Sequence, residues 1–295
     1  MLYDIRLNIT YRYASLATGG RHLVRLMPAD IPGVQRLIAG HLDIAPEPAE
    51  RTDRADFFGN LCSDFAFRSA HDQITLRLQA RVQRLATSAR PVGSAPLAEL
   101  PGLVAATRSL DPLAPSHFTS PSPRVPPDAE VIAFARRSAA ADSLTAVEAL
   151  GQAIHAEMRY DPEATDVDTP MAEAFAARHG VCQDFSHIMI AGLRGIGIPA
   201  GYVSGFLRTI PPPGKPRLEG ADAMHAWVRA WCGPEAGWVE YDPTNATFAG
   251  HDHIAVAHGR DYFDVAPVKG VLRIYGGQSS EQAVDVIPLD DAMRA

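Results

Sequence analysis

The first third of the chain alternates between apolar and polar residues with a period of two. In residues 2–13 the odd positions are apolar or aromatic, and most of the even positions are polar. The same alternation returns in residues 73–85, and shorter strand-like runs cover residues 21–26 and 61–68. This period is typical of half-buried β-strands. The pattern therefore predicts an N-terminal antiparallel β-sandwich domain over residues 1–88.

The alternation stops in the next segment, which is rich in proline. Nine prolines lie between Pro91 and Pro127, with few periodic apolar positions among them. Proline removes backbone donors and restricts the chain, so such a stretch favours an irregular connection. Because a loop of this length is unusual inside a compact domain, we place a linker and a domain boundary at residues 89–127.

Apolar residues then recur at steps of three and four, which is the period of a helix. The pattern predicts helices over residues 129–140, 142–158 and 171–178, and a fourth that starts at Cys182. Strand-like runs follow at residues 200–210, 223–232, 237–241, 271–275 and 283–288. The proline-rich segment at residues 211–216 is a predicted loop, since it cannot join a central strand. Helices followed by antiparallel strands indicate an α+β domain over residues 128–295.

Composition and charge exclude several classes of protein. The chain has 295 residues, 46% hydrophobic and 21% charged, with a net charge of −7. It lacks the basic surface of a nucleic-acid-binding protein, and the single basic cluster, Lys215–Arg217, is expected only to border a substrate cleft. No signal-like or membrane-spanning apolar stretch occurs, and three cysteines without CxxC spacing do not form a disulfide framework. These features predict a cytoplasmic protein without a membrane or nucleic-acid partner.

Three residues in the second domain could form a nucleophile, a base and an orienting group. Cys182 opens a predicted helix, where free N–H groups and the helix dipole favour a thiolate and can hold an oxyanion. His225 lies early in a predicted strand and Asp242 ends the next one. If these strands form a hairpin around Gly233-Pro234, the two side chains lie nearly opposite each other, about 5 Å apart. A buried structural cysteine is the alternative for Cys182 alone, but the three together favour catalysis.

The neighbours of these residues allow two interpretations each. Gln183 could donate a hydrogen bond to an oxyanion, although the backbone N–H of Cys182 is the better candidate. Asp184 could stabilise the first helical turn or contact substrate. Trp227 shares a strand face with His225, where it would shield the site or simply fill the core.

A cluster of histidines raises the question of a metal. His251 and His253 form an HxH motif, with His258 nearby, and zinc favours such ligands. No CxxC or HExxH motif accompanies them. We therefore expect a solvated loop here and no metal or other cofactor.

Three sequence blocks resemble the motifs of the transglutaminase-like superfamily: GVCQDF at residues 180–185, MHAW at 224–227 and YDPTN at 241–245. The chain is most similar to bacterial members that have been provisionally assigned as cysteine proteases and carry an N-terminal β domain, with DFFGN at residues 56–60 as its recognisable piece. The resemblance implies a papain-like core, with Cys182 as nucleophile, His225 as general base and acid, and Asp242 as the orienting residue.

These observations predict a cysteine-dependent enzyme that cleaves amide bonds of a peptide or protein through a thioester. Hydrolysis is the favoured outcome, because a transferase must exclude water. The alternatives are a transglutaminase, in which an amine resolves the thioester, and a non-catalytic peptide-binding module. A zinc-dependent hydrolase that uses His251 and His253 is a third alternative.

Overall fold

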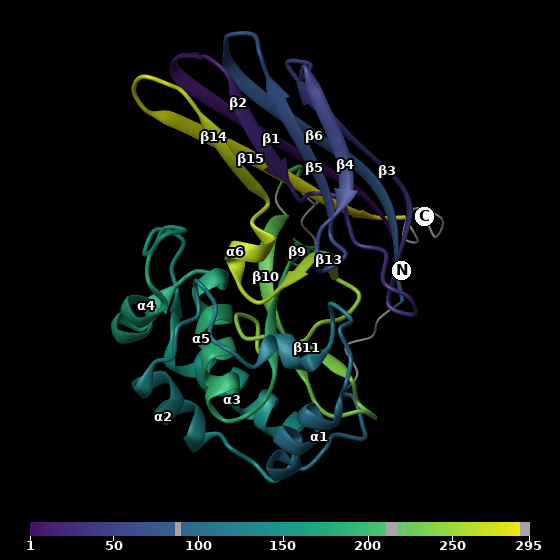
Figure 1. The fold of residues 1–295 in the computed structure, drawn as a ribbon, viewed down its shortest axis with the longest axis vertical. Helices are drawn as coiled ribbons and strands as arrows, with labels where there is room; N and C mark the ends of the chain where they lie inside the picture. The colour runs from purple at the N-terminus through teal and green to yellow at the C-terminus, as the bar shows by residue number, and fades with distance from the viewer. Residues whose placement is uncertain (86–89, 211–217, 221, 290–295) are drawn as a thin grey trace.

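The computed structural model describes residues 1–85, 90–210, 218–220 and 222–289. Figure 1 shows a β-sandwich at one end of the molecule and a mixed helical and β core at the other. The predicted loop at residues 211–216 and the basic cluster Lys215–Arg217 lie outside the described residues. The α+β fold class predicted from the sequence is confirmed.

The sandwich consists of two four-stranded antiparallel sheets. The first, here called the β15 sheet, has the order β15 (Gln278–Pro288), β1 (Leu2–Ala17), β6 (His71–Arg84) and β3 (Gln35–Ala45). The second, the β14 sheet, has the order β14 (Val268–Leu272), β2 (Gly20–Val24), β5 (Leu61–Phe67) and β4 (Glu50–Ala55). The odd residues of β1 from Tyr3 to Ile9 are buried, as their alternation predicts.

The sandwich contains strands from both ends of the chain. β14 pairs with β2 and β15 pairs with β1, so the chain leaves the sandwich after β6, forms the core and returns. This differs from the predicted division, which placed all of residues 128–295 in the core. The alternation of β15 shows that it is a strand, but a strand's own pattern does not identify its partner.

The core sheet is antiparallel and has the order β12 (Thr247–Phe248), β11 (Trp238–Asp242), β10 (Ala223–Trp231), β9 (Ala200–Leu207) and β13 (His253–Gly259). Helix α5 (Cys182–Gly195) packs on β9 and β10, and α2 (Ala129–Arg137), α3 (Ser143–Glu157) and α4 (Met171–Ala177) pack against α5. A two-residue parallel pair, β7 (Arg159–Tyr160) and β8 (His179–Gly180), precedes α5. None of the helices in the described part of the chain has the length and apolarity needed to cross a bilayer.

The predicted linker is folded onto the core where it is described. It contains two 3-10 turns (Leu97–Glu99 and Pro115–Phe118) and the helix α1 (Leu100–Ala106). Leu100 and Val125 are buried in the main hydrophobic core, and Phe118 is fully enclosed. The prolines therefore impose irregular backbone without preventing burial of the apolar residues between them.

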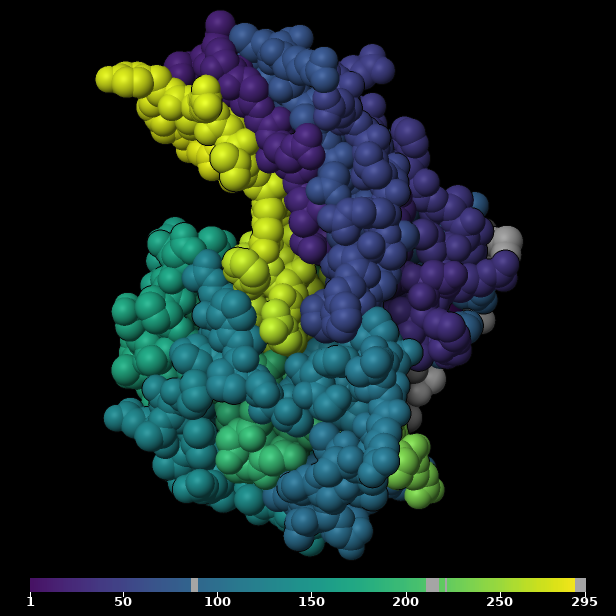
Figure 2. Space-filling view, viewed as in Figure 1, coloured from purple at the N-terminus to yellow at the C-terminus, as the bar shows by residue number. Residues whose placement is uncertain are grey.

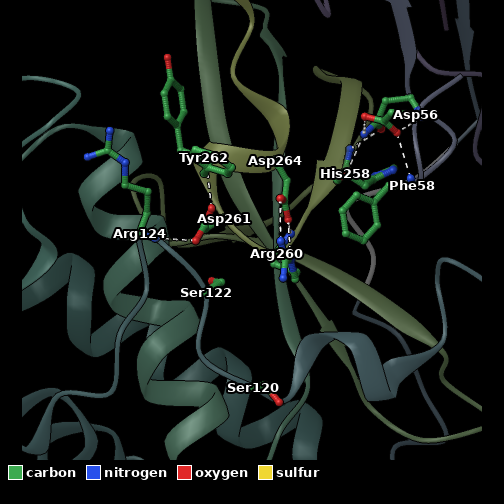
Figure 3. A network of polar contacts seen from close by, with 12 residues as sticks. Asp56, Phe58, Ser120, Ser122, Arg124, His258, Arg260, Asp261, Tyr262 and Asp264 are labelled. Carbon is green, nitrogen blue, oxygen red and sulfur yellow. Dashed lines mark hydrogen bonds and ion pairs between the residues drawn. The ribbon is translucent and has the colours of Figure 1, made fainter. Parts of the chain in front are cut away.

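Two amide side chains of the sandwich complete the free edge of the core sheet. Gln35 donates from Nε2 to the carbonyl of Ala255 (2.7 Å) and accepts from the Ala255 N–H (2.9 Å). Asn60 makes the same pair of bonds with His258, both 2.8 Å long. Asp56, in the same turn as Asn60, accepts a hydrogen bond from the N–H of Phe58 (Figure 3). Because backbone groups of β13 are satisfied in this way, the two parts of the molecule meet at a specific, buried polar interface.

Candidate active site

The N-terminus of α5 is held by a buried carboxylate. Asp184 accepts hydrogen bonds at Oδ2 from the Val181 N–H (2.8 Å) and from the Thr165 hydroxyl (2.6 Å). Burial raises the pKa of Asp184, which these donors partly offset. Asp184 is fully enclosed and caps the helix, so it is a structural neighbour of Cys182 that does not line the cleft.

Cys182 and Gln183 are the first two residues of α5, so their N–H groups have no acceptor within the helix. Cys182 is half-buried and lines a cleft. The side chain of Gln183 donates to the carbonyl of Val167 (3.2 Å), which ties the preceding loop to the helix. The backbone, more than the Gln183 amide, is therefore available to a developing oxyanion at this position.

His225 lies between Cys182 and Asp242. Its Nε2 is 2.8 Å from Oδ2 of Asp242, which leaves Nδ1 as the ring nitrogen available to Cys182 in the same cleft. Burial alone would lower the pKa of His225, but the bonds with Asp242 and Cys182 outweigh it and raise the pKa to about 10. The three predicted residues are thus brought together at one site.

The hairpin register differs from the predicted one by two residues. Val228 pairs with Tyr241, and the turn spans the residues between Trp231 and Trp238 instead of centring on Gly233-Pro234. Asp242 therefore reaches His225 diagonally across the sheet. Diagonal neighbours on the same face of two paired antiparallel strands are close enough for long side chains to touch.

Asp242 is fully buried and accepts several hydrogen bonds. Oδ2 accepts from His225, from His253 (3.1 Å) and from the Asn245 amide (2.7 Å). Oδ1 accepts from the N–H groups of Thr244 (2.9 Å) and Asn245 (3.2 Å). Burial alone would raise the pKa of this carboxyl, but the bonds from the two histidines hold it well below its ordinary value.

The prediction of a solvated loop around His253 and His258 was wrong. Both residues are buried in β13. The run HIAVAHG is enclosed on both faces, so it lacks the alternation that indicates a strand in the sequence. His253 is the residue of this site whose role the sequence did not indicate.

His225, Asp242 and His253 offer ligand atoms that all lie within 4.8 Å of one another. His253 accepts at Nδ1 from the Gly250 N–H (3.3 Å), so its Nε2 carries the hydrogen and donates the hydrogen bond to Asp242. In this arrangement His225 and His253 direct N–H donors at the carboxylate of Asp242. A metal ion would instead be bound by histidine nitrogens that carry a lone pair. His251, the other half of the HxH motif, is not part of this cluster.

The cleft beside Cys182 has a volume of about 310 Å³ and lies between the sandwich and the core. Figure 2 shows the hollow between the C-terminal strands, drawn in yellow, and the helices of the core. The wall of the cleft is largely uncharged, and its residues include Tyr11, Val167, Tyr202, Met224, Tyr262 and Gln282. Tyr11 and Gln282 belong to the sandwich, and nothing in their local sequence indicates this position.

Tyr262 is held in the cleft wall by a polar network on the core side. Its N–H donates to Nε2 of His187 (3.2 Å). The preceding Asp261 caps the short helix α6 (Tyr262–Val265) and accepts from the N–H of Arg124 (2.7 Å), as Figure 3 shows. Burial lowers the pKa of His187 to about 4, which keeps this histidine neutral and able to accept the bond.

Comparisons with known proteins agree with this architecture. Residues 3–83 match the model of the bacterial transglutaminase-like N-terminal region, and residues 132–243 match that of the transglutaminase-like superfamily core. An uncharacterized protein of Mycobacterium tuberculosis is 34% identical, over 99% of this chain and 95% of its own length. The chain belongs to the transglutaminase-like superfamily.

A second relative, from Mycobacterium leprae, is 32% identical over 95% of this chain and 96% of its own length. A crystal structure of a protein from Cytophaga hutchinsonii, provisionally designated a cysteine protease, has the same fold. Its TM-score is 0.74 at 20% identity, with 98% of this chain and 91% of that chain covered. The superfamily core match contains Cys182, His225 and Asp242 but ends before β13 and His253.

Behind the three candidate residues of this transglutaminase-like core lies a second buried layer. Trp227 is fully enclosed and donates from Nε1 to Oε2 of Glu240 (2.9 Å). Glu240 also faces His258 (3.4 Å) and Arg84 (3.6 Å). Burial alone would raise the pKa of Glu240, but these partners hold it below its ordinary value. Trp227 therefore supports His225 from behind and is not a residue of the cleft wall.

Proposed function

We propose that this protein is a cysteine-dependent hydrolase of amide bonds in peptides or proteins, with Cys182 as nucleophile, His225 as acid and base, and Asp242 as the orienting residue. The observation that carries the proposal is that Cys182 and His225 line the same cleft, with Nε2 of His225 2.8 Å from the buried carboxylate of Asp242. With its pKa raised to about 10, His225 is an imidazolium at neutral pH, the charge state that a cysteine nucleophile needs beside it.

In the first step the Cys182 thiolate attacks the amide carbonyl carbon, and the electron pair of the C=O bond moves to oxygen. The N–H groups of Cys182 and Gln183 hold this oxyanion. His225 gives its Nδ1 proton to the amide nitrogen, the C–N bond breaks, and a thioester and a free amine result. In the second step His225 takes a proton from water, whose oxygen attacks the thioester carbonyl. The C–S bond then breaks, the acid leaves, and the Cys182 thiolate and the His225 imidazolium are regenerated.

Hydrolysis is favoured over transfer to an amine because Cys182 is half-buried in a cleft that opens between the two parts of the molecule. Water can therefore reach the thioester, whereas a transferase must exclude it. A transglutaminase would instead form an amide with an added amine, and this outcome is measured in the same assay.

The test starts with the reactivity of the thiols. Wild-type protein is treated with substoichiometric iodoacetamide between pH 5 and 9, and the labelled sites are mapped by mass spectrometry. Cys62 and Cys232 serve as internal controls, since burial raises the pKa of both, that of Cys232 to about 12. We expect selective labelling of Cys182 near pH 6, and its loss in His225→Ala.

Peptide amide substrates are then incubated with the protein, with and without a primary amine, and the products are identified by mass spectrometry. The free acid is the expected product. If Cys182 labels no faster than Cys62 and Cys232, the catalytic proposal is wrong and the non-catalytic peptide-binding alternative takes its place.

A further inference from the structure

Strand β15 forms the outer edge of its sheet, and its backbone orientation follows from the bonds at both ends. Leu289 donates its N–H to the carbonyl of Leu2 (2.8 Å), and Gly277 accepts from the N–H of Ala14 (3.0 Å). Odd-numbered residues of β15 therefore face β1, because orientation alternates along an antiparallel strand. The N–H and C=O groups of the even-numbered residues point away from the sheet.

Part of this outer edge is already paired. Asp222, just before β10, donates its N–H to the carbonyl of Val284 (3.2 Å) and accepts from the Val286 N–H at Oδ2 (2.7 Å). The outer edge of β15 thus already pairs with a short extended segment of the same chain, at Asp222. Asp222 is followed by Met224 and His225, so this paired part lies next to the cleft.

The adjoining part of the edge is open. Gln282 and Ser280 are the next two residues whose backbone groups point outward, and both are exposed. No described residue pairs with their N–H or C=O groups. Charged residues and proline commonly block an exposed edge strand; residues 278–283 contain no proline or lysine, and their one charged residue, Glu281, pairs with Arg12 of the neighbouring strand. Gln282 also lines the cleft beside Cys182, so the open edge continues directly from the candidate active site.

We propose that the open edge of β15 is a substrate subsite that binds an extended polypeptide as an added strand and leads it to Cys182. The inference rests on the proposed function and names its substrate class: an unfolded segment with uncharged side chains near the scissile amide. Main-chain bonds to Ser280 and Gln282 would supply affinity independent of sequence. The uncharged cleft wall, with Tyr11, Met224 and Tyr262, would select the side chains.

Hydrogen exchange tests the subsite without requiring catalysis. Cys182→Ala protein is mixed with reduced, carboxymethylated α-lactalbumin, or with folded α-lactalbumin as the control. Exchange of the Ser280 and Gln282 amides is followed by mass spectrometry with electron-transfer fragmentation. We expect both amides to exchange more slowly with the unfolded probe and to be unchanged with the folded one. Unchanged exchange at these two amides with both probes would overturn the proposal.

A pair of variants tests the same bonds in the active protein. Ser280→Pro removes an outward N–H and leaves the bonds between β15 and β1 in place, whereas Ser280→Ala keeps the N–H. For a quenched fluorescent peptide of about ten residues, we expect KM to rise about five- to tenfold in Ser280→Pro only, as for the loss of one hydrogen bond. A dipeptide amide should show no change. Equal iodoacetamide labelling of Cys182 verifies that both variants are folded.

The outcomes separate the two proposals. If Cys182 is unreactive and no amide is cleaved, the proposed function fails, and the exchange experiment alone decides whether the edge binds polypeptide. If wild-type protein cleaves peptides but Ser280→Pro matches Ser280→Ala on the long substrate, the subsite is wrong and the function stands.

Discussion

At the scale of single residues, the site is organised around the carboxylate of Asp242. Hydrogen bonds from His225, His253 and Asn245 converge on Oδ2, and backbone N–H groups occupy Oδ1. Each bond to a buried charge is strong, and together they fix the plane of the carboxylate. The orientation of His225 depends on this plane, so residues that never touch substrate contribute to the geometry of the reaction.

His253→Phe keeps a ring of similar shape but removes the bond to Asp242. We expect the free energy of unfolding to fall by about 2–3 kcal/mol, the usual effect of losing a bond to a charged group. We also expect kcat to fall about tenfold or more with little change in KM, because Asp242 gains freedom to rotate. Urea denaturation and steady-state kinetics measure the two effects. His22→Phe is the matched control, since this buried histidine stacks on Phe65 and makes no hydrogen bond among the described residues. Equal kinetics for the two variants would rule out a positioning role for His253.

His225 and His22 should influence stability in opposite directions as the pH changes. The pKa of His225 is raised to about 10 in the folded protein, so its contribution is complete below pH 6.5 and is lost as the pH rises towards 10. Burial, with a smaller effect of His71, lowers the pKa of His22 to about 4, so this residue costs stability as the pH falls from 6.5 to 4.

Urea denaturation of His225→Gln, His22→Gln and wild type between pH 4 and 10 measures these contributions. The deficit of His225→Gln relative to wild type should be largest near pH 6 and shrink towards pH 10. His22→Gln should gain on wild type only below pH 6.5. A pH-independent deficit in His225→Gln would show that His225 is not held as an imidazolium.

At the scale of secondary-structure elements, helix α5 and the hairpin of β10 and β11 could be predicted closely. The spacing of apolar residues at steps of three and four, with Gly180 just before the helix, predicted α5. The Asp242-Pro243 pair predicted where β11 ends. Two features could not be predicted. The hairpin register depends on how the turn between Trp231 and Trp238 closes, and β13 is buried on both faces and so shows no periodicity.

The close packing of β9 against β10 and β13 can be tested at Gly205. It pairs with His225 across β9 and β10, and an added Cβ would lie 2.2 Å from the carbonyl oxygen of Ile254 and 2.5 Å from the Trp227 ring. We expect Gly205→Ala to lower the free energy of unfolding by about 1–3 kcal/mol through overpacking. Cys182 labelling at pH 6 should slow as well, because the ring of Trp227 supports His225.

Gly102→Ala in α1 is the control for Gly205→Ala. No heavy atom lies within 4 Å of its added Cβ, and alanine favours the helix by roughly 0.8–1 kcal/mol. Urea denaturation of both variants makes the comparison. If Gly205→Ala is as stable as wild type, β9 and β13 are less tightly apposed than the structure indicates.

At the scale of the whole molecule, the core is an insertion within the sandwich. The first and last strands, β1 and β15, pair with each other, and the N-terminal half of the sandwich could be predicted because its strands alternate. The return of the chain to form β14 and β15 could not be predicted, since pairing between distant strands leaves no local signal. The same return places Gln282 in the cleft, so the sandwich is part of the candidate active site.

We expect Gln35 and Asn60 to couple the two parts of the molecule during unfolding, because each bonds to the backbone of β13. All three tryptophans, Trp227, Trp231 and Trp238, lie in the core, so their fluorescence reports on the core, whereas far-UV circular dichroism also reports on the sandwich. We expect the two signals to give one coincident urea transition in the wild type. In the double variant Gln35→Ala/Asn60→Ala the unpaired backbone of β13 should cost about 1–3 kcal/mol at each position, and the transitions should separate.

Gln79→Ala, an exposed glutamine on β6, provides the control and should leave the transition single. Coincident transitions in the double variant would mean that the interface does not depend on the two amides. Other polar contacts, such as those of Arg84 with Gly250 and Glu240 and that of Asp222 with Val286, would then hold the two parts together. Separation of the transitions would instead show that two side-chain amides, acting as a substitute strand on β13, make the sandwich and the core one cooperative unit. That coupling would hold the open edge of β15 in a fixed position beside Cys182, as the proposed substrate subsite requires.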